Sequence, residues 1–157
     1  ISDTVLDYTQ ENAAMAANLV ASRRLGATNA IASLAVPLGN TINMNGTAVY
    51  MGVTAVFAAQ IYGLPLTFSD QVIVVLTGVL AAIGTAGVPG AGLIMSTLVF
   101  TQIGIPLEVV ALIAGVDRVL DMIRTSINVV GDSTTALAVS RMEGELGSEP
   151  FDEEEAK

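Results

Sequence analysis

The chain contains no cysteine and no histidine, and only 13% of its residues are charged. The lack of cysteine excludes a disulfide framework and thiol chemistry. Without either residue type, and with no Ser or Thr beside an evident general base, a membrane-embedded enzyme is the weakest functional hypothesis. Six Lys and Arg residues against fifteen Asp and Glu residues form no basic patch, so a nucleic-acid surface is not expected.

Charge is scarcest in the middle of the chain. Between residues 26 and 139 the acids and bases are Asp70, Glu108, Asp117, Arg118, Asp121, Arg124 and Asp132. Hydrophobic residues make up 52% of the sequence, which is unusual for a soluble domain of this length. The predicted fold class is therefore an all-α integral membrane protein.

The two ends of the chain are polar. Residues 1–26 carry acids early and Arg23 and Arg24 late, which suits a helix dipole, and we expect a helix or linker outside the hydrocarbon, without an assigned role. Residues 142–157 hold much of the net negative charge and are predicted to be a solvated, disordered acidic tail. Because the chain starts at Ile1 and shows no signal-peptide pattern, we expect a fragment or a processed form.

Residues 27–66 are uncharged and long enough for about one tilted membrane span. Pro37, Gly39 and the run from Asn43 to Thr47 interrupt the helical pattern near its middle. One interpretation is a kinked span packed by small residues. The other is a discontinuous helix whose freed carbonyls and Asn side chains bind a cation.

Residues 70–105 centre on the glycine-rich run 84–92. The flanking halves, 71–83 and 93–105, would each be roughly 20 Å long as helices, too short to cross a bilayer of about 30 Å. They are too apolar for a loop, and this combination predicts a re-entrant helical hairpin. A phosphate-binding loop is disfavoured because no Lys-Ser/Thr pair follows the glycines.

A final transmembrane helix is predicted over residues 106–141. Its polar residues follow steps of three and four, so they share one helix face: Asp117, Asp121, Arg124, Asn128 and Asp132. Arg124 would lie some seventeen residues into this helix, near the bilayer midplane, where a charge indicates a functional partner or a wet cavity. The alternative is a purely structural ion pair with Asp121 or Asp117.

The positive-inside rule gives an orientation. If the first and last apolar segments cross and the middle one only enters, Arg23, Arg24 and Arg141 all lie on one side. That side is predicted to be the cytoplasm, which places both ends of this chain there in a multi-pass protein of the cell (inner) membrane.

Three segments carry a family resemblance: PLGNTINMNGTAVY at 37–50, AAIGTAGVPGAG at 81–92 and GVDRVLDMIRTSINVVGD at 115–132. Together they resemble the C-terminal transport core of the dicarboxylate/amino acid:cation symporters, the glutamate and aspartate transporter family, over residues 30–144. The resemblance implies a homotrimer in which a scaffold domain carries a transport domain that moves like an elevator. It matches residues 27–64 to a broken helix, 70–105 to the outer gating hairpin and 106–141 to the substrate-binding helix.

The resemblance also implies roles for individual residues. Arg124 would bind the substrate's side-chain carboxylate, Asp121 its ammonium and Asn128 its main-chain carboxylate, with Thr125, Thr47, Val88 and Gly92 completing the pocket. One sodium site would comprise Gly39, Asn43, Asn128 and Asp132. A second would comprise Thr41 and the carbonyls of Ala82, Ile83 and Thr85.

The sequence departs from the family pattern in two places. Asn45 stands where the family motif has Asp, whose carboxylate serves a third cation site. The inner hairpin with its serine-rich tip is not recognisable in residues 1–25, and the scaffold domain is absent from the chain.

The functional hypothesis is cation-coupled secondary transport of an acidic amino acid, with sodium as the coupling ion. Arg124 favours an acidic over a neutral substrate, and Asp121 favours an amino acid over a plain dicarboxylate. The alternatives are a proton-coupled dicarboxylate carrier and a truncated, non-transporting membrane module that binds or serves as structure.

Overall fold

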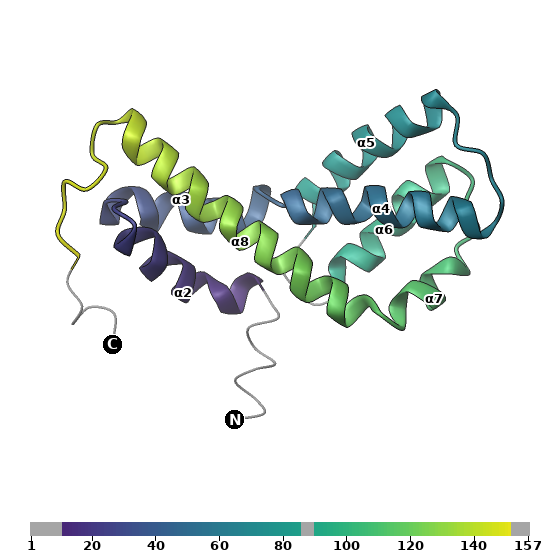
Figure 1. The fold of residues 1–157 in the computed structure, drawn as a ribbon, viewed down its shortest axis with the longest axis horizontal. Coiled ribbons are helices and arrows are strands. Elements are labelled where there is room, and N and C mark those ends of the chain that lie inside the picture. The colour runs from purple at the N-terminus through teal and green to yellow at the C-terminus, as the bar shows by residue number, and fades with distance from the viewer. Residues whose placement is uncertain (1–10, 86–89, 152–157) are drawn as a thin grey trace.

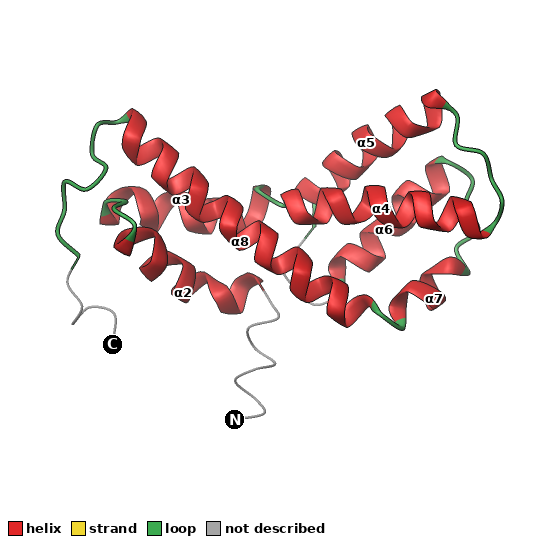
Figure 2. Cartoon of the chain, in the orientation of Figure 1, coloured by secondary structure: helices red, strands yellow, loops and turns green. Residues whose placement is uncertain are grey.

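The computed structural model describes residues 11–85 and 90–151, and in this part of the chain every regular element is a helix (Figures 1 and 2). The helices are α2 (Glu11–Arg24), α3 (Asn29–Ile42), α4 (Asn45–Ile61), α5 (Phe68–Ile83), α6 (Ala91–Gln102), α7 (Val109–Ala114) and α8 (Asp117–Met142). The all-helical prediction is confirmed for the described residues.

Helix α8 is the axis of the molecule (Figure 1). Helices α2 and α3 pack against each other and against its C-terminal half, where Ala32, Val36 and Ala136 are fully buried. Helix α4 packs against α5, α6 and α8, and a second core there includes Met51 and Phe100. The polar face of α8 therefore lies between two small apolar cores.

Residues 27–66 are interrupted at Asn43 and Met44, as in the discontinuous-helix interpretation rather than the kinked-span one. These residues have ψ values of 58° and 49°, outside the helical range, so α3 ends and α4 restarts. Pro37 is not at the break but inside α3. The Asn side chains compete for backbone hydrogen bonds, which favours an interruption where two of them flank a single residue.

Residues 70–105 contain two helices in contact, α5, which ends at Ile83, and α6, which begins at Ala91. Thr67 begins α5 with a capping box, in which its hydroxyl accepts from the Asp70 N–H and the Asp70 carboxylate accepts from the Thr67 N–H. Gly90, with φ of +72°, precedes α6 in the left-handed conformation that glycine adopts most readily. Val88 and the rest of 86–89 lie outside the described residues.

The prediction of one helix over residues 106–141 is wrong. The chain forms the short helix α7 and then α8, with a break at Gly115 and Val116. The Val116 N–H donates to the Ile113 carbonyl, a tighter i to i−3 bond of 3.0 Å, and a φ of −118° at Val116 takes the chain out of the helix. Arg124 is consequently seven residues into α8, about 10 Å from its start, rather than seventeen residues into a long helix.

Residues 143–150 are exposed, as predicted for a solvated acidic tail, but residues 143–151 are not detached from the fold as a disordered tail would be. Gly147, Glu145 and Glu149 in this segment each make a hydrogen bond to the turn between α2 and α3. Carboxylates beside backbone and hydroxyl donors hold a segment that composition alone assigns to solvent.

Large apolar side chains cover much of the outer surface; Phe68, Leu80 and Leu34 are 82%, 70% and 69% exposed. In the part of the chain that the structure describes, however, no single helix combines the length and apolar character needed to span a bilayer.

Candidate functional site

The site is built around the guanidinium of Arg124, which is 5% exposed. It forms an ion pair with Asp121, one turn earlier, and a second, at 3.7 Å, with Asp117. Steps of three and four residues on α8 bring these side chains together, as the sequence spacing predicts. Nη1 of Arg124 has no hydrogen-bond partner although it is buried, so one edge of the fork is available for a further acceptor.

Tyr50 of α4 completes the surroundings of Arg124. Its hydroxyl donates to Oδ1 of Asp117 at 3.1 Å, and the centroid of its ring lies 4.4 Å from Cζ of Arg124. The ring face attracts the cation, while the hydroxyl orients one of the two carboxylates that compensate it. Arg124 is therefore held from α8 and from α4.

Gly92, in the first turn of α6, covers the guanidinium. A Cβ built on Gly92 would lie 2.8 Å from Cζ of Arg124, so a side chain there would displace the guanidinium. The absence of a side chain at Gly92 thus lets the backbone of α6 approach the fork. The structure brings Gly92 and Arg124 together, as predicted.

The second part of the site joins α8 to the start of α4. Oδ1 of Asn128 accepts from the Gly46 N–H at 2.7 Å, and Nδ2 of Asn128 donates to the Thr47 hydroxyl and the Met44 sulfur, both at 3.3 Å. Asn128 therefore caps α4 from another helix and satisfies one of the amides that a helix start leaves unpaired. Gly46 permits this crossing, because a Cβ there would lie 2.5 Å from the Arg124 carbonyl.

The third part lies between α3 and α8. Asp132 is 1% exposed, and its Oδ1 accepts from Nδ2 of Asn43 at 3.0 Å. A side chain on Gly39 would collide with the same oxygen. Among the described residues no Lys or Arg pairs with Asp132, and no group of three or more His, Cys, Asp or Glu side chains could bind a metal ion.

The remaining predicted residues are placed unevenly. Thr125 is buried beside Arg124 on α8, whereas Asn45 is exposed and its Oδ1 accepts from the Gly46 N–H at 2.9 Å. Thr41 is also exposed and donates to the Pro37 carbonyl of its own helix. Near the end of α5, Ala82 is buried and Ile83 is exposed. Thr85, two residues after α5, is buried, and its hydroxyl donates to the Ala81 carbonyl of that helix.

Hollows adjoin these residues at several places. One of about 150 Å³ lies between α4 and α8 and is lined by Gly46, Val49, Tyr50, Val53, Leu120, Ile123, Arg124 and Ile127. A more open one of about 550 Å³ is lined by Asn43, Asn45, Ser126, Ile127, Val130, Gly131, Thr134 and Thr135. The first gives access to the charged part of the site and the second to its amide part.

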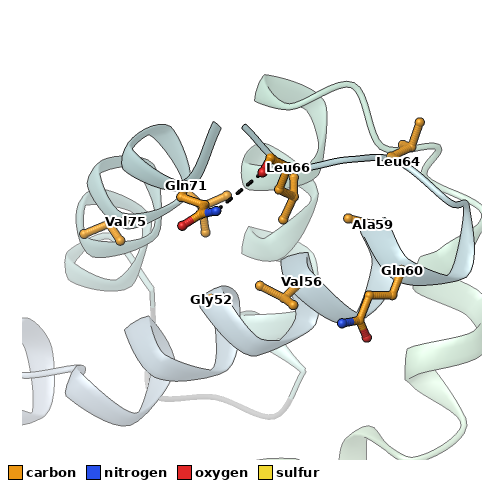
Figure 3. A pocket seen from close by; sticks show the side chains of 9 residues that line it. Gly52, Val56, Ala59, Gln60, Leu64, Leu66, Gln71 and Val75 are labelled. Atoms are coloured by element: carbon orange, nitrogen blue, oxygen red, sulfur yellow. Dashed lines mark hydrogen bonds between the residues drawn. The ribbon is translucent and has the colours of Figure 1, made fainter. Parts of the chain in front are cut away.

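Figure 3 shows a third hollow, between α4 and α5, that is chemically different. Its volume is about 530 Å³ and its lining is mostly apolar. The polar side chains there are Gln60 and Gln71, and Nε2 of Gln71 donates to the Leu66 carbonyl at 3.4 Å. None of the predicted site residues lies in it.

Sequence reasoning missed Tyr50 and Met44. Tyr50 lies four residues after Gly46 and three after Thr47, so a helical reading of that stretch places its hydroxyl on the same face. That spacing in an uncharged segment was the available signal. Met44 offered none, because a thioether in an apolar run is indistinguishable from ordinary core.

Comparison with known proteins supports the resemblance. The model of the sodium:dicarboxylate symporter family matches residues 9–142, a range that includes α2, which sequence reasoning left unassigned. Three of the most similar curated relatives are a proton/sodium-glutamate symport protein of Bacillus caldotenax, an excitatory amino acid transporter of Onchocerca volvulus and a proton/glutamate-aspartate symporter of Escherichia coli (strain K12).

Their identities to this chain are 38% over 126 residues, 51% over 112 and 42% over 118, covering 80%, 71% and 75% of it. The chain spans less than a third of the length of these relatives, namely 30%, 23% and 27%. The buried Arg124 fork, the break at Asn43 and the family match over most of the chain lead to one conclusion: the chain belongs to the sodium:dicarboxylate symporter family.

Proposed function

We propose that this chain forms the substrate-binding core of a cation-coupled secondary transporter for an acidic amino acid, aspartate or glutamate. The observation that carries the proposal is the buried Arg124 guanidinium, held by two carboxylates and covered by Gly92. A guanidinium presents two parallel N–H donors that match a carboxylate. The relatives named as glutamate or glutamate-aspartate symporters support the same substrate class.

Substrate binding is proposed as an exchange of partners at Arg124. The substrate's side-chain carboxylate takes the edge of the fork where Nη1 has no hydrogen bond. Asp121 faces the ammonium and Asn128 the main-chain carboxylate. Thr125, Thr47, Gly92 and Val88 line the remainder of the pocket.

Coupling to cations follows from the buried charges. Asp117, Asp121 and Asp132 are at most 8% exposed, and Arg124 is the one buried guanidinium among the described residues. It pairs with Asp117 and Asp121 but not with Asp132, so two of the three negative charges remain uncompensated. An acidic amino acid adds a third. Because uncompensated buried charge is strongly unfavourable, binding an acidic substrate here requires cations.

Sodium is the proposed coupling ion, and Asp132 is its proposed anchor. Carboxylate and amide oxygens are suited to a hard cation, and Asp132 lies with Gly39 and Asn43 beside Asn128 on the next turn of α8. A second sodium is assigned to Thr41 and the carbonyls of Ala82, Ile83 and Thr85, and it would bind as the hairpin closes. Asn45 weakens a third site, because an amide retains an oxygen but lacks the charge.

The membrane setting is part of the proposal. The exposed apolar side chains on α3 and α5 support contact with lipid or with a further apolar domain. Residues 27–141 form the transport core, α5 and α6 form a re-entrant hairpin that gates the site, and both ends of the chain face the cytoplasm. An elevator-like movement against a scaffold domain in a homotrimer completes the cycle.

A proton-coupled dicarboxylate carrier is the second candidate. The relatives named as proton symporters favour proton coupling, and a carboxylate such as Asp132 can bind a proton where it would otherwise bind a cation. In that mechanism the ammonium contact at Asp121 is dispensable, so succinate should bind as well as aspartate.

Calorimetric titration of the detergent-solubilised protein that contains this chain tests the proposal. Aspartate should bind in sodium chloride and not in choline chloride, and succinate and serine should bind more weakly. Equal, sodium-independent binding of succinate and aspartate that varies with pH would favour the dicarboxylate carrier. Absence of binding in every condition would leave a structural ion-pair network as the role of the polar face.

A further inference from the structure

We propose that residues 143–151, the C-terminal strap, are an intramolecular ligand of the turn between α2 and α3, and that docking of the strap fixes the distance between α3 and α8. Figure 1 shows this segment returning from the end of α8 towards the side of the molecule where α2 and α3 lie. The strap contains none of the residues of the proposed substrate and sodium sites, so its role is additional to theirs.

Backbone contact is the first part of the docking. The Gly147 N–H donates to the Gly26 carbonyl at 2.7 Å. A Cβ on Gly26 would lie 3.3 Å from the same nitrogen, and Gly26 has a φ of +107°, so a larger residue would disturb the contact in two ways. The turn is shaped to accept a backbone.

Two carboxylates of the strap are the second part. Oε2 of Glu149 accepts from the Asn29 N–H at 2.7 Å, and Oε2 of Glu145 accepts from the Thr28 hydroxyl at 3.1 Å. Asn29 is the first residue of α3, so Glu149 supplies a negative charge to a helix start whose own residue Thr28 makes no side-chain cap. Thr28 is 2% exposed, so its hydroxyl is shielded within the turn, whereas Glu145 binds it from the exposed side.

An aromatic contact is the third part. The guanidinium carbons of Arg23 and Arg24 lie 5.6 and 5.3 Å from the centroid of the Phe151 ring. Cation–π contacts of this kind orient both arginines towards the strap. Backbone, carboxylate and aromatic groups thus engage one turn together, and an acidic segment with an aromatic end is the chemistry that the turn recognises.

The position of the strap gives it leverage on α3 and α8. It leaves α8 after Met142 and binds α3 at Asn29, and both points are ten residues, or about 15 Å, from the facing residues Asp132 and Gly39. Between them the helices leave a hollow of about 580 Å³, which reaches from Ala30 to Asn43. Small side chains pack α3 on α8. A strap that connects the C-terminal end of α8 to the N-terminal end of α3 limits how far the two helices can separate.

The test compares Glu149→Gln/Phe151→Ala with Glu143→Gln. The control removes the same charge from the same segment at Glu143, an exposed residue whose side chain makes no hydrogen bond or ion pair to the turn among the described residues. In hydrogen–deuterium exchange, amides of residues 26–32 should exchange about tenfold faster in the double variant than in the control, because a charge-assisted hydrogen bond is lost. Choline chloride should accelerate exchange in the unmodified protein and have less effect in the double variant. Equal exchange in all three proteins would show that the strap does not dock on the turn.

The coupling of the strap to the cation site rests on the proposed function and is measured separately. The double variant should need severalfold more sodium for half-maximal aspartate binding, whereas the control should not. Faster exchange with unchanged sodium dependence would overturn the coupling and leave the docking intact. If no protein binds aspartate, the proposed function fails, and the exchange result still decides whether the strap docks.

Discussion

The Arg124 end and the Asp132 end of the polar face on α8 differ in how their charges are compensated. At the first end a guanidinium lies between two carboxylates and under an aromatic ring. At the other end a carboxylate that is 1% exposed has an amide as its hydrogen-bond partner. A buried carboxylate with a neutral partner is more costly than one with a cation, so the two ends are suited to ligands of opposite charge.

The largest expected effect is at Arg124. Replacing it with Lys or Thr removes the paired donors, and charged hydrogen bonds contribute roughly 1.5–3 kcal/mol each, so aspartate affinity should fall on the order of a hundredfold. Lys should rescue little because a point charge cannot match the fork. Serine affinity should fall much less or rise, since Asp121 and Asn128 remain. Calorimetry with both amino acids measures this.

A structural role for Arg124 has a different outcome. Loss of the guanidinium would then leave Asp121 and Asp117 uncompensated and lower the thermal unfolding temperature whatever the ligand. Variants that remain folded and bind aspartate as the unmodified protein does would remove the acidic-substrate assignment.

The next largest effect is expected at Asp132, where a substitution tests whether this end of the polar face binds the cation. Asp132→Asn keeps the shape and the contact to Asn43 but removes the charge. Aspartate affinity in sodium should fall about tenfold, within the usual range of coupling between two sites, and its dependence on sodium should become shallower. Titrating aspartate at several sodium concentrations measures both. An unchanged sodium slope would place the cation elsewhere.

A smaller effect is expected at Tyr50. Tyr50→Phe retains the ring over Arg124 and removes the hydrogen bond to Asp117, which is worth about 1 kcal/mol. Aspartate affinity should fall about fivefold. The dependence on sodium should stay the same, because the substitution affects only the Arg124 end. Tyr50→Leu, which removes the ring as well, serves as the comparison. A change in the sodium slope in the Phe variant would show that the two ends are not separable.

The smallest effect is expected at Asn45, which is exposed and already bonded to the Gly46 N–H. An Asp side chain can accept the same N–H, so Asn45→Asp should fold normally. If the amide has removed a charge-dependent cation site, the added carboxylate should steepen the dependence of aspartate affinity on sodium. Equal slopes for the two proteins would contradict a third site at this position.

Prediction from the sequence succeeded where helix periodicity or the local conformational preference of a residue type determines the structure. The steps of three and four from Asp117 to Asp132 place those side chains on one helix face because helix geometry is fixed. Asn43 and Asn45, with the glycines at 84–92, indicated interruptions because these residue types weaken helices locally. The same local information located the Arg124–Asp121 pair.

Prediction failed where distant contacts decide the outcome. The break at Gly115 and Val116 falls in an apolar run that reads as helix. The strap is held by Gly26 and Asn29, more than a hundred residues away, so its composition suggested only solvent. Tyr50 of α4 donates a hydrogen bond to Asp117 of α8, and a contact between two helices cannot be predicted from spacing along the sequence.

Asn128 illustrates how little rearrangement the proposed binding reaction demands. Its Oδ1 accepts from the Gly46 N–H at the start of α4, while its Nδ2 donates to the Thr47 hydroxyl and to the Met44 sulfur, a weak acceptor. A substrate carboxylate is a stronger acceptor than a thioether, and Nδ2 can exchange one for the other without release of α4. The rotamer entropy of that side chain is already spent in folding, so the donor is preorganised and its contribution to affinity is not reduced by ordering.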